Sequence, residues 1–335
     1  MEITVNKIPS PTWNWLRMND LKTESFSGNT GKREVITTLP EALSEKNDFS
    51  LDLKTGMGDD FNKEAEEAGH VLAVTLPEDG KNIRTEIKYD IKDGVFNNLE
   101  LIAGKNSSSI VIMRYQGDNS GEAGVQTRFM VEDGAELTLV QIQETKNGTF
   151  NNDIGGKVGE KGKFRLIQLI TGGHDNRFGS FVSLEGKKAE FASDTGYELN
   201  GSDRLDINTV SDHTGKKTLA NINVAGVLRG TSRKLFRGTI DFHRGCAGAK
   251  GDEMESVLLM DDDVENKTIP VILCDEEDVE GNHGASIGKI DEDLMFYLES
   301  RGMNEEAIYE MMAKAKIDSI IAKIPDEETR KALLK

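Results

Sequence analysis

The chain has 335 residues, a formal net charge of −18 and a mean hydropathy of −0.48. A chain of this length can bury a large core and hold two or three structural units. The strong negative charge disfavours nucleic acids as partners, because their phosphate groups would be repelled. Only two cysteines are present, without a Cys-x-x-Cys motif, so neither a zinc ribbon nor a self-contained cluster motif is expected.

The sequence pattern favours a cytoplasmic location. No apolar run approaches the ~20 residues that a membrane span requires. Residues 1–15 lack a positive stretch followed by an apolar one, so no signal peptide is expected. The low cysteine content is typical of a reducing compartment.

Residues 1–70 are predicted to form a small mixed α/β region. Trp13 and Trp15 follow two prolines, and their simplest role is to anchor the start of the chain onto the core. Residues 59–69 are predicted to form a short helix, with Gly69 near its C-terminal end.

Residues 71–288 are predicted to form a β-rich core. β-Branched and aromatic residues alternate with polar ones in segments such as 71–75, 137–142 and 164–170, as half-buried strands require. Long helical patterns do not interrupt these segments, which excludes a βαβ alternation and its nucleotide crevice. Periodicity alone leaves a sandwich, a barrel and a β-solenoid open. Strand–corner–strand patterns suit the turns of a solenoid.

Residues 289–335 are predicted to be helical. Asp291, Asn304 and Asp326 can each cap a helix, and Pro325 should end the second one. Apolar residues of that second helix recur every 3.6 positions and suit either core packing or docking of a partner. The predicted stripe is Ile308, Met311, Met312, Ala315, Ile320, Ile321 and Ile324.

Candidate chemistry centres on His283. The segment up to Gly288 is acidic, rich in glycine and turn-forming, so we expect His283 in a turn where the sheet meets the helices. A neutral imidazole can bind a metal or carry a proton, but it can equally satisfy nearby backbone groups. Cys274 and Cys246 are candidate helpers, because thiolates with an imidazole suit iron. Two thiols and one histidine leave a four-ligand site incomplete, and small buried strand residues are the alternative interpretation of both cysteines.

The segment from Asp275 to Gly302 resembles the core signature of the SufB/SufD family, the scaffold proteins of the Suf iron–sulfur assembly system. A histidine at its centre is typical of SufD, whereas SufB usually has a glutamate there. Matching residues are Asp278-Val279, His283-Gly284-Ala285, Gly288 and the run Phe296-Tyr297-Leu298-Glu299-Ser300-Arg301-Gly302.

Two further stretches resemble the same family, and two positions depart from it. The Pro-Trp opening and the strand Phe236-Arg237-Gly238-Thr239-Ile240 match, and the strand is expected to pack in the core. Many SufD-like chains have a cysteine where Gly281 stands here. The cysteine typical of SufB is replaced by the run 261–263, which contains three aspartates.

The resemblance implies a mainly β fold with a right-handed parallel β-helix at its core. It also implies a cytoplasmic, non-catalytic SufD-like scaffold that acts with a SufB-like chain and the SufC ATPase. His283 would act in iron acquisition and cluster formation, facing a SufB thiolate across a subunit interface, and Asp278 would orient its ring. ATP would bind to SufC, because this chain has no phosphate-binding loop.

SufC would dock on the C-terminal helices, as the resemblance implies. The candidate contacts are Met303, Tyr309, Met311 and Met312. We expect no tightly bound cofactor. Transient iron or an iron–sulfur cluster at an interface fits the family, and flavin binding is left open.

Two other interpretations are also open. The chain could form a homodimeric SufBD-type scaffold with SufC alone, pairing with itself through the β-helix. A more remote alternative is a carbohydrate-active enzyme, since parallel β-helices often carry such sites. That chemistry needs paired carboxylates in a groove lined with aromatic residues, and aromatic residues make up only 6% of this chain.

Overall fold

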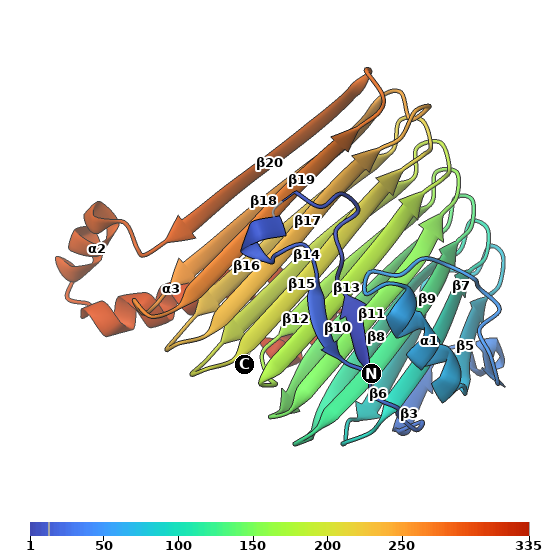
Figure 1. Cartoon of the computed structure of the whole chain (residues 1–335), viewed down its shortest axis with the longest axis horizontal. Coiled ribbons are helices and arrows are strands. Elements are labelled where there is room, and N and C mark those ends of the chain that lie inside the picture. Colours follow the sequence, from blue (N-terminus) through green and yellow to red (C-terminus); the bar gives the residue numbers. More distant parts are fainter. Residues whose placement is uncertain (13, 335) are drawn as a thin grey trace.

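The structure, a computed structural model, describes residues 1–12 and 14–334. Its core is a β-helix in which sixteen consecutive strands, β5 to β20, alternate between two facing sheets (Figure 1). Each strand pairs in parallel with the strand two positions along the chain, so one odd and one even strand make one turn. Eight turns result, which confirms the mainly β fold and the parallel β-helix.

The odd-numbered strands form one nine-stranded sheet. In spatial order it contains β19 (Glu265–Cys274), β17 (Arg233–Phe242), β15 (Arg204–His213), β13 (Asp175–Leu184), β11 (Thr149–Val158), β9 (Glu122–Val131), β7 (Phe96–Ala103), β5 (Val71–Leu76) and β4 (Leu43–Lys46).

The even-numbered strands and β3 form the other nine-stranded sheet. In spatial order it contains β20 (Val279–Gly288), β18 (Ala249–Leu259), β16 (Leu219–Leu228), β14 (Glu190–Leu199), β12 (Lys163–Ile170), β10 (Glu136–Lys146), β8 (Ser108–Asp118), β6 (Ile83–Asp90) and β3 (Lys32–Thr37).

The interior of the coil is one continuous core from β5 to β18, because alternate side chains of these strands point into it. Aromatic rings stack from turn to turn: Phe129 lies over Phe164 at a centroid distance of 3.8 Å, and Phe164 lies 5.8 Å from Phe191. Glycines with positive φ, such as Gly201 and Gly230, let the backbone reverse at the corners. Stacked turns therefore pack on one another along the β-helix.

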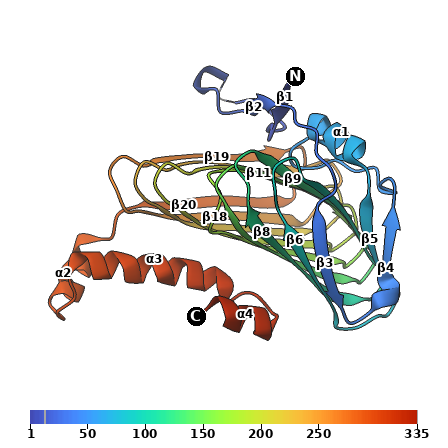
Figure 2. The same ribbon diagram turned by 90° about the horizontal axis from the view of Figure 1, so that it is seen from below.

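The N-terminal segment crosses the outer face of the odd sheet (Figure 2). It contains the antiparallel pair β1 (Glu2–Val5) and β2 (Leu21–Glu24), the 3-10 turn η1 (Asn14–Leu16) and the helix α1 (Asp59–Ala68). A buried Arg237 fixes this segment, because its guanidinium donates to the Met18 carbonyl (2.7 Å) and to Asp206 (2.6 Å). The helix predicted over residues 59–69 is confirmed.

The expected tryptophan anchor is wrong for Trp15, which is 78% exposed, and Trp13 lies outside the described residues. The anchoring role falls instead to Met18, which is buried against Ile269 and Val271 of β19.

The C-terminal helices are α2 (Glu292–Glu299), α3 (Glu305–Ile321) and α4 (Glu327–Leu333), and the predicted caps Asp291, Asn304 and Asp326 each accept backbone N–H groups. Of these helices, α3 and α4 lie along the outer face of the even sheet, whereas α2 projects away from it (Figure 2). The apolar stripe of α3 differs in part from the prediction. Met311 and Ala315 are exposed, while Ala313 and Ile317 take buried places.

Within residues 1–12 and 14–334, no helix is long and apolar enough to cross a membrane.

Candidate functional site at the last turn of the β-helix

The last turn, formed by β19 and β20, is the open end of the coil. Both strands lie at the edges of their sheets. In β14, an inner strand, half or more of the residues are buried, whereas every residue of β20 is at least partly exposed. The inward positions of the last turn are therefore accessible from outside.

Pro270 makes the free edge of β19 less able to pair with a further strand than the free edge of β20. The N–H of Asp275 donates to the Phe242 carbonyl (2.8 Å) and that of Glu265 to Ser232 (2.9 Å), so odd-numbered amides of β19 face β17. The nitrogen of Pro270 therefore lies on the free edge, where its missing N–H costs no ladder hydrogen bond but removes one docking point. β20 contains no proline, so its edge keeps its N–H groups.

His283 lies in the middle of β20, and the prediction that it sits in a turn is wrong. It pairs in register with Glu253 of β18, which is buried inside the coil. Side chains of register partners in a parallel pair point to the same side of the sheet. The side chain of His283 therefore points to the interior side, and it is exposed because no further turn of the described chain covers it. The glycines favour turns locally, but the ladder offered by β18 outweighs that preference.

The two cysteines occupy different environments. Cys274 ends β19 and is exposed, and its Sγ donates to the Glu276 carbonyl (3.0 Å). Cys246 is fully buried in the corner between β17 and β18, and burial raises the pKa of its thiol to about 11. A thiol held protonated by burial is a poor metal ligand. Of the two cysteines, only Cys274 is therefore accessible to a metal ion from solvent.

The structure does not gather the predicted site residues into one cluster. Asp278 precedes β20, and its carbonyl accepts from the Gly248 amide (2.6 Å). Among the described residues, no hydrogen bond or ion pair joins Asp278 to His283. No group of three metal-ligating side chains in the described chain includes His283, Cys246 or Cys274. The roles given to these residues remain predictions.

A buried charged layer lies directly beneath the last turn. Lys234 forms an ion pair with Glu255 and donates to Thr268 (2.9 Å), whose hydroxyl in turn donates to Glu255 (2.6 Å). Neighbouring Glu253 is 3% exposed, and burial, with Glu255 close by, raises its pKa to about 8. Burial thus favours the neutral form of the Glu253 carboxyl, which lies on the strand next to His283 and on the same side of the sheet.

Gly238 creates the space for this carboxyl. A Cβ added to Gly238 would lie 2.0 Å from Glu253 Oε2, a distance that side chains do not tolerate. Sequence reasoning placed Gly238 in the core but missed Glu253. The signal was present in the alternation of residues 249–257, where the positions of Glu253 and Glu255 match those of buried Ala249, Gly251 and Val257.

The C-terminal helices carry an exposed apolar surface on α2, which sequence analysis did not single out. Leu294, Phe296 and Tyr297 are 38%, 74% and 51% exposed, and α2 has no buried residue. In Figure 1, α2 projects beyond the last turn, away from the sheets. Of the predicted contacts, Met311 is exposed and Met303 half-buried.

Tyr309 and Met312, the other two predicted contacts, instead pack on the apolar surface of the even sheet. Both remain partly exposed, and their role as contacts stays a prediction.

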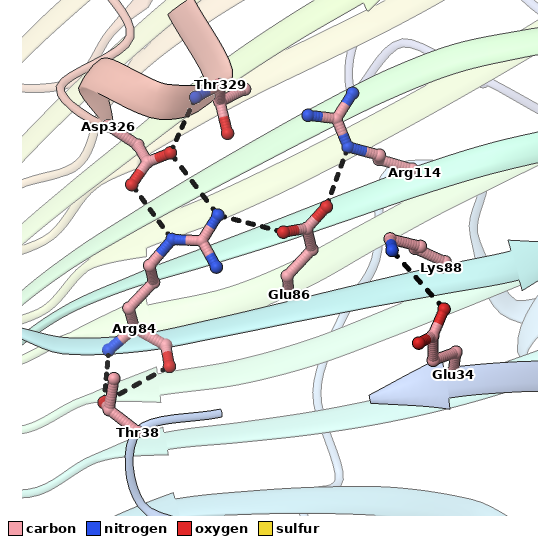
Figure 3. Close-up of polar contacts among 8 residues, drawn as sticks. All are labelled: Glu34, Thr38, Arg84, Glu86, Lys88, Arg114, Asp326 and Thr329. Atoms are coloured by element: carbon pink, nitrogen blue, oxygen red, sulfur yellow. Dashed lines mark hydrogen bonds and ion pairs between the residues drawn. The ribbon is translucent and has the colours of Figure 1, made fainter. Parts of the chain in front are cut away.

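The far end of the helical segment is clamped to the first turns (Figure 3). Asp326 accepts from Arg84 Nε of β6 (3.0 Å) and caps α4 through the Thr329 amide (2.9 Å). Arg84 also pairs with Glu86 (2.9 Å), which in turn accepts from Arg114 (2.9 Å). Together with Arg229–Glu310 and Lys323–Asp194, these pairs hold the helices along the sheet.

Comparison with known proteins identifies the family. A family model described as the SufBD core domain of SUF system FeS cluster assembly matches residues 86–316, more than half of the chain. The chain belongs to the SufBD family. The matched region contains the β-helix from β6 onward, His283, α2 and most of α3.

Individual SufBD relatives are distant and longer. The iron–sulfur cluster assembly protein SufD of Bacillus subtilis is 23% identical over 245 residues, which are 72% of this chain and 56% of that protein. A chloroplastic SufBD family protein of Arabidopsis thaliana is 29% identical over 205 residues, 58% of this chain and 36% of that protein. The chain thus spans about half the length, or less, of these relatives.

Proposed function

We propose that this SufBD chain is a SufD-like scaffold subunit for iron–sulfur cluster assembly, acting with a SufB-like chain and a SufC-type ATPase. It is itself non-catalytic, and ATP hydrolysis takes place in the partner. Iron and sulfide are its cargo and it needs no tightly bound cofactor. The observation that carries this proposal is His283, exposed on the inward side of an open last turn.

The free edge of β20 is the proposed subunit interface. A strand from a partner can add to this edge by main-chain hydrogen bonds, as edge strands do in β-augmentation. That pairing would cover the inward positions of the last turn and enclose His283 above Glu253. A thiolate from the partner would supply the soft ligand that His283 lacks in its own chain, and the neutral Glu253 would exchange protons with it.

The exposed surface of α2 is the proposed contact for the ATPase. Phe296 and Tyr297 present large apolar areas, and such residues dominate the energy of protein interfaces. Met303 and Met311 lie on accessible parts of the same helical segment. Movement of the ATPase would be transmitted along α3 to the even sheet, on which Ile317 and Ile320 are packed.

A homodimeric scaffold is the second candidate, and the same edge favours it. Two copies of β20 can pair across a twofold axis, which is how symmetric dimers are commonly built. The mass of the complex co-purified with SufC, with and without a SufB-like chain, distinguishes the homodimer from the mixed complex.

Anaerobic co-expression with the SufB-like and SufC partners tests the proposal. We expect His283→Ala to leave the complex assembled while its content of iron and sulfide falls at least severalfold. His174→Ala is the matched control, because His174 is also exposed but lies far along the coil and pairs with Asp203. Normal iron and sulfide loading by His283→Ala would refute the proposed role.

The same preparation tests the docking surface. Phe296→Asp should remove the ATPase from the complex and keep the SufB-like partner, because a charge in an apolar contact is costly. Ile36→Asp is the control, since Ile36 is 44% exposed on β3 at the other end of the molecule. Retention of the ATPase by Phe296→Asp would place its contact elsewhere.

A further inference from the structure

A second group of metal-ligating side chains lies on the outer face of the odd sheet. Asp212 is on β15, Asp241 on β17, and His243 follows the end of β17. His243 Nε2 lies 2.7 Å from Asp212 Oδ1 and 3.5 Å from Asp241 Oδ2. One ligand atom from each of the three lies within 4.8 Å of the others, a spacing that fits a single ion.

The β-helix itself holds these groups in place. Asp212 and Asp241 are register partners on adjacent strands, so their carboxylates stand side by side on one face. Ser183, the register partner of Asp212 on β13, donates its hydroxyl to Asp212 Oδ2 (3.0 Å). One carboxylate oxygen is thereby fixed, and the other is left directed at the imidazole. All three ligand residues are half-buried, so they are accessible yet restrained.

The charges of this group do not balance. Like charges directly opposite each other on neighbouring strands are destabilising. Asp275 adds a third carboxylate, which acts electrostatically on both Asp241 and His243. Within the described residues, His243 is the only ion-pair partner of Asp212 and Asp241, and Lys54 is near Asp241 without forming an ion pair. A bound cation would offset this excess.

We propose that Asp212, Asp241 and His243 bind one divalent first-row transition ion of the Fe²⁺ or Mn²⁺ type. One imidazole nitrogen with two carboxylate oxygens suits these ions, whereas Ca²⁺ and Mg²⁺ prefer oxygen ligands alone. Water would fill the remaining positions. The site is separate from His283, which faces the interior side of the coil, and it does not depend on the proposed assembly function.

Anaerobic equilibrium dialysis of the full chain against Mn²⁺, and separately Fe²⁺, tests this site. We expect one ion per chain, with binding at least tenfold weaker in Asp241→Asn and in His243→Gln. Ser183→Ala should cause a smaller loss, because Ser183 only positions Asp212. His174→Gln is the matched control: His174 pairs with Asp203 (3.3 Å) but lacks a second carboxylate, so binding should not change.

The outcomes separate clearly. Circular dichroism checks that each variant is folded, and if one of the two ligand variants does not fold, the other decides. Absence of Mn²⁺ and Fe²⁺ binding by the wild-type chain would overturn the site. Unchanged affinity in the folded ligand variants would also overturn it, because the ion would then be held elsewhere. Binding of Ca²⁺ but of neither transition ion would overturn the ion class.

Discussion

The two ends of the β-helix are built in opposite ways. At the first turn, formed by β5 and β6, the chain covers its own edges: β4 pairs antiparallel with β5, and β3 with β6. The turn η2 (Pro40–Ala42) adds Ala42 to the interior core. At the last turn, β19 and β20 end their sheets without such covering strands in the described chain. One end is thus covered by its own polypeptide, whereas the other end has no such cover in the described chain.

The interior changes composition between these ends. Near the first turn it is aliphatic and aromatic, with Ile87, Tyr89 and Leu101 fully buried. Near the last turn it contains the pair Lys234–Glu255, and the inward residues of β20 are Val279, Gly281, His283, Ala285 and Ile287. Small and polar residues limit the apolar area that this edge exposes to water. The interior is therefore more polar near the open end of the coil than near the covered end.

Two matched isoleucines measure the difference between the ends most directly. Ile87 of β6 is fully buried, whereas Ile287 of β20 is 42% exposed, and both belong to the even sheet. Ile87→Ala should lower the free energy of unfolding by about 2–5 kcal/mol, because it leaves a cavity. Ile287→Ala should cost less than about 1 kcal/mol in the isolated chain. Denaturant unfolding of both variants measures this.

Addition of a partner sharpens the same test. If the last turn is an interface, Ile287→Ala should weaken association while it barely changes the isolated chain. Equal costs for the two variants in the isolated chain would contradict the comparison, because the last turn would then be as closed as the first.

The sequence predicts the coil well and its last strand poorly. Alternating apolar residues identify the strands, and caps such as Asp291 and Asn304 identify the helices, because these signals are local. His283 was placed in a turn because the glycines around it dominate the local pattern. Its strand conformation depends on the ladder with β18, and such pairing depends on residues about 30 positions away.

The candidate site shows the same limit. A resemblance to a known family singles out His283. It does not predict that Glu253 lies on the strand next to His283, or that Gly238 faces Glu253 across the interior. Nor did it find Asp212, Asp241 and His243, because a group drawn from two strands leaves no compact motif. Only the register of the sheets brings them together.

The buried Glu253 predicts that stability depends on pH through a group near the open end. Its pKa in the folded chain is about 8, above the ordinary value near 4.3 of the unfolded chain, and burial is the main cause. The neutral form is therefore favoured by folding. Its contribution to stability is full below pH ~4 and is lost as the pH rises towards 8.

Replacement of this carboxyl isolates its contribution. Glu253→Gln should flatten the loss of stability between pH 5 and 8 by about 1–3 kcal/mol, since one pKa unit corresponds to ~1.4 kcal/mol. Urea unfolding at several pH values measures this. Glu255→Gln is the contrasting variant, because it removes the partner of Lys234. A pH profile of Glu253→Gln identical to that of the wild type would show that the carboxyl is already ionised.

A further pH-dependent effect concerns Asp326, which ties the helices that follow the open end back to the closed end (Figure 3). Burial would raise the pKa of Asp326, but hydrogen bonds from Arg84 and Thr329 outweigh burial and lower the pKa to about 2. The ionised form is favoured by folding, so its contribution is present above pH ~4 and is lost as the pH falls towards 2.

Two substitutions at this position separate its roles. Asp326→Asn can keep the cap of α4 but loses the charge that pairs with Arg84, whereas Asp326→Ala loses both. We expect a cost of about 1 kcal/mol for Asp326→Ala and less for Asp326→Asn. Hydrogen exchange of residues 327–333 reports release of α4 from the sheet. If exchange rises equally in both variants, the ion pair with Arg84 holds the helix. If exchange rises only in Asp326→Ala, the N-cap of α4 holds the helix, and the ion pair with Arg84 contributes nothing measurable.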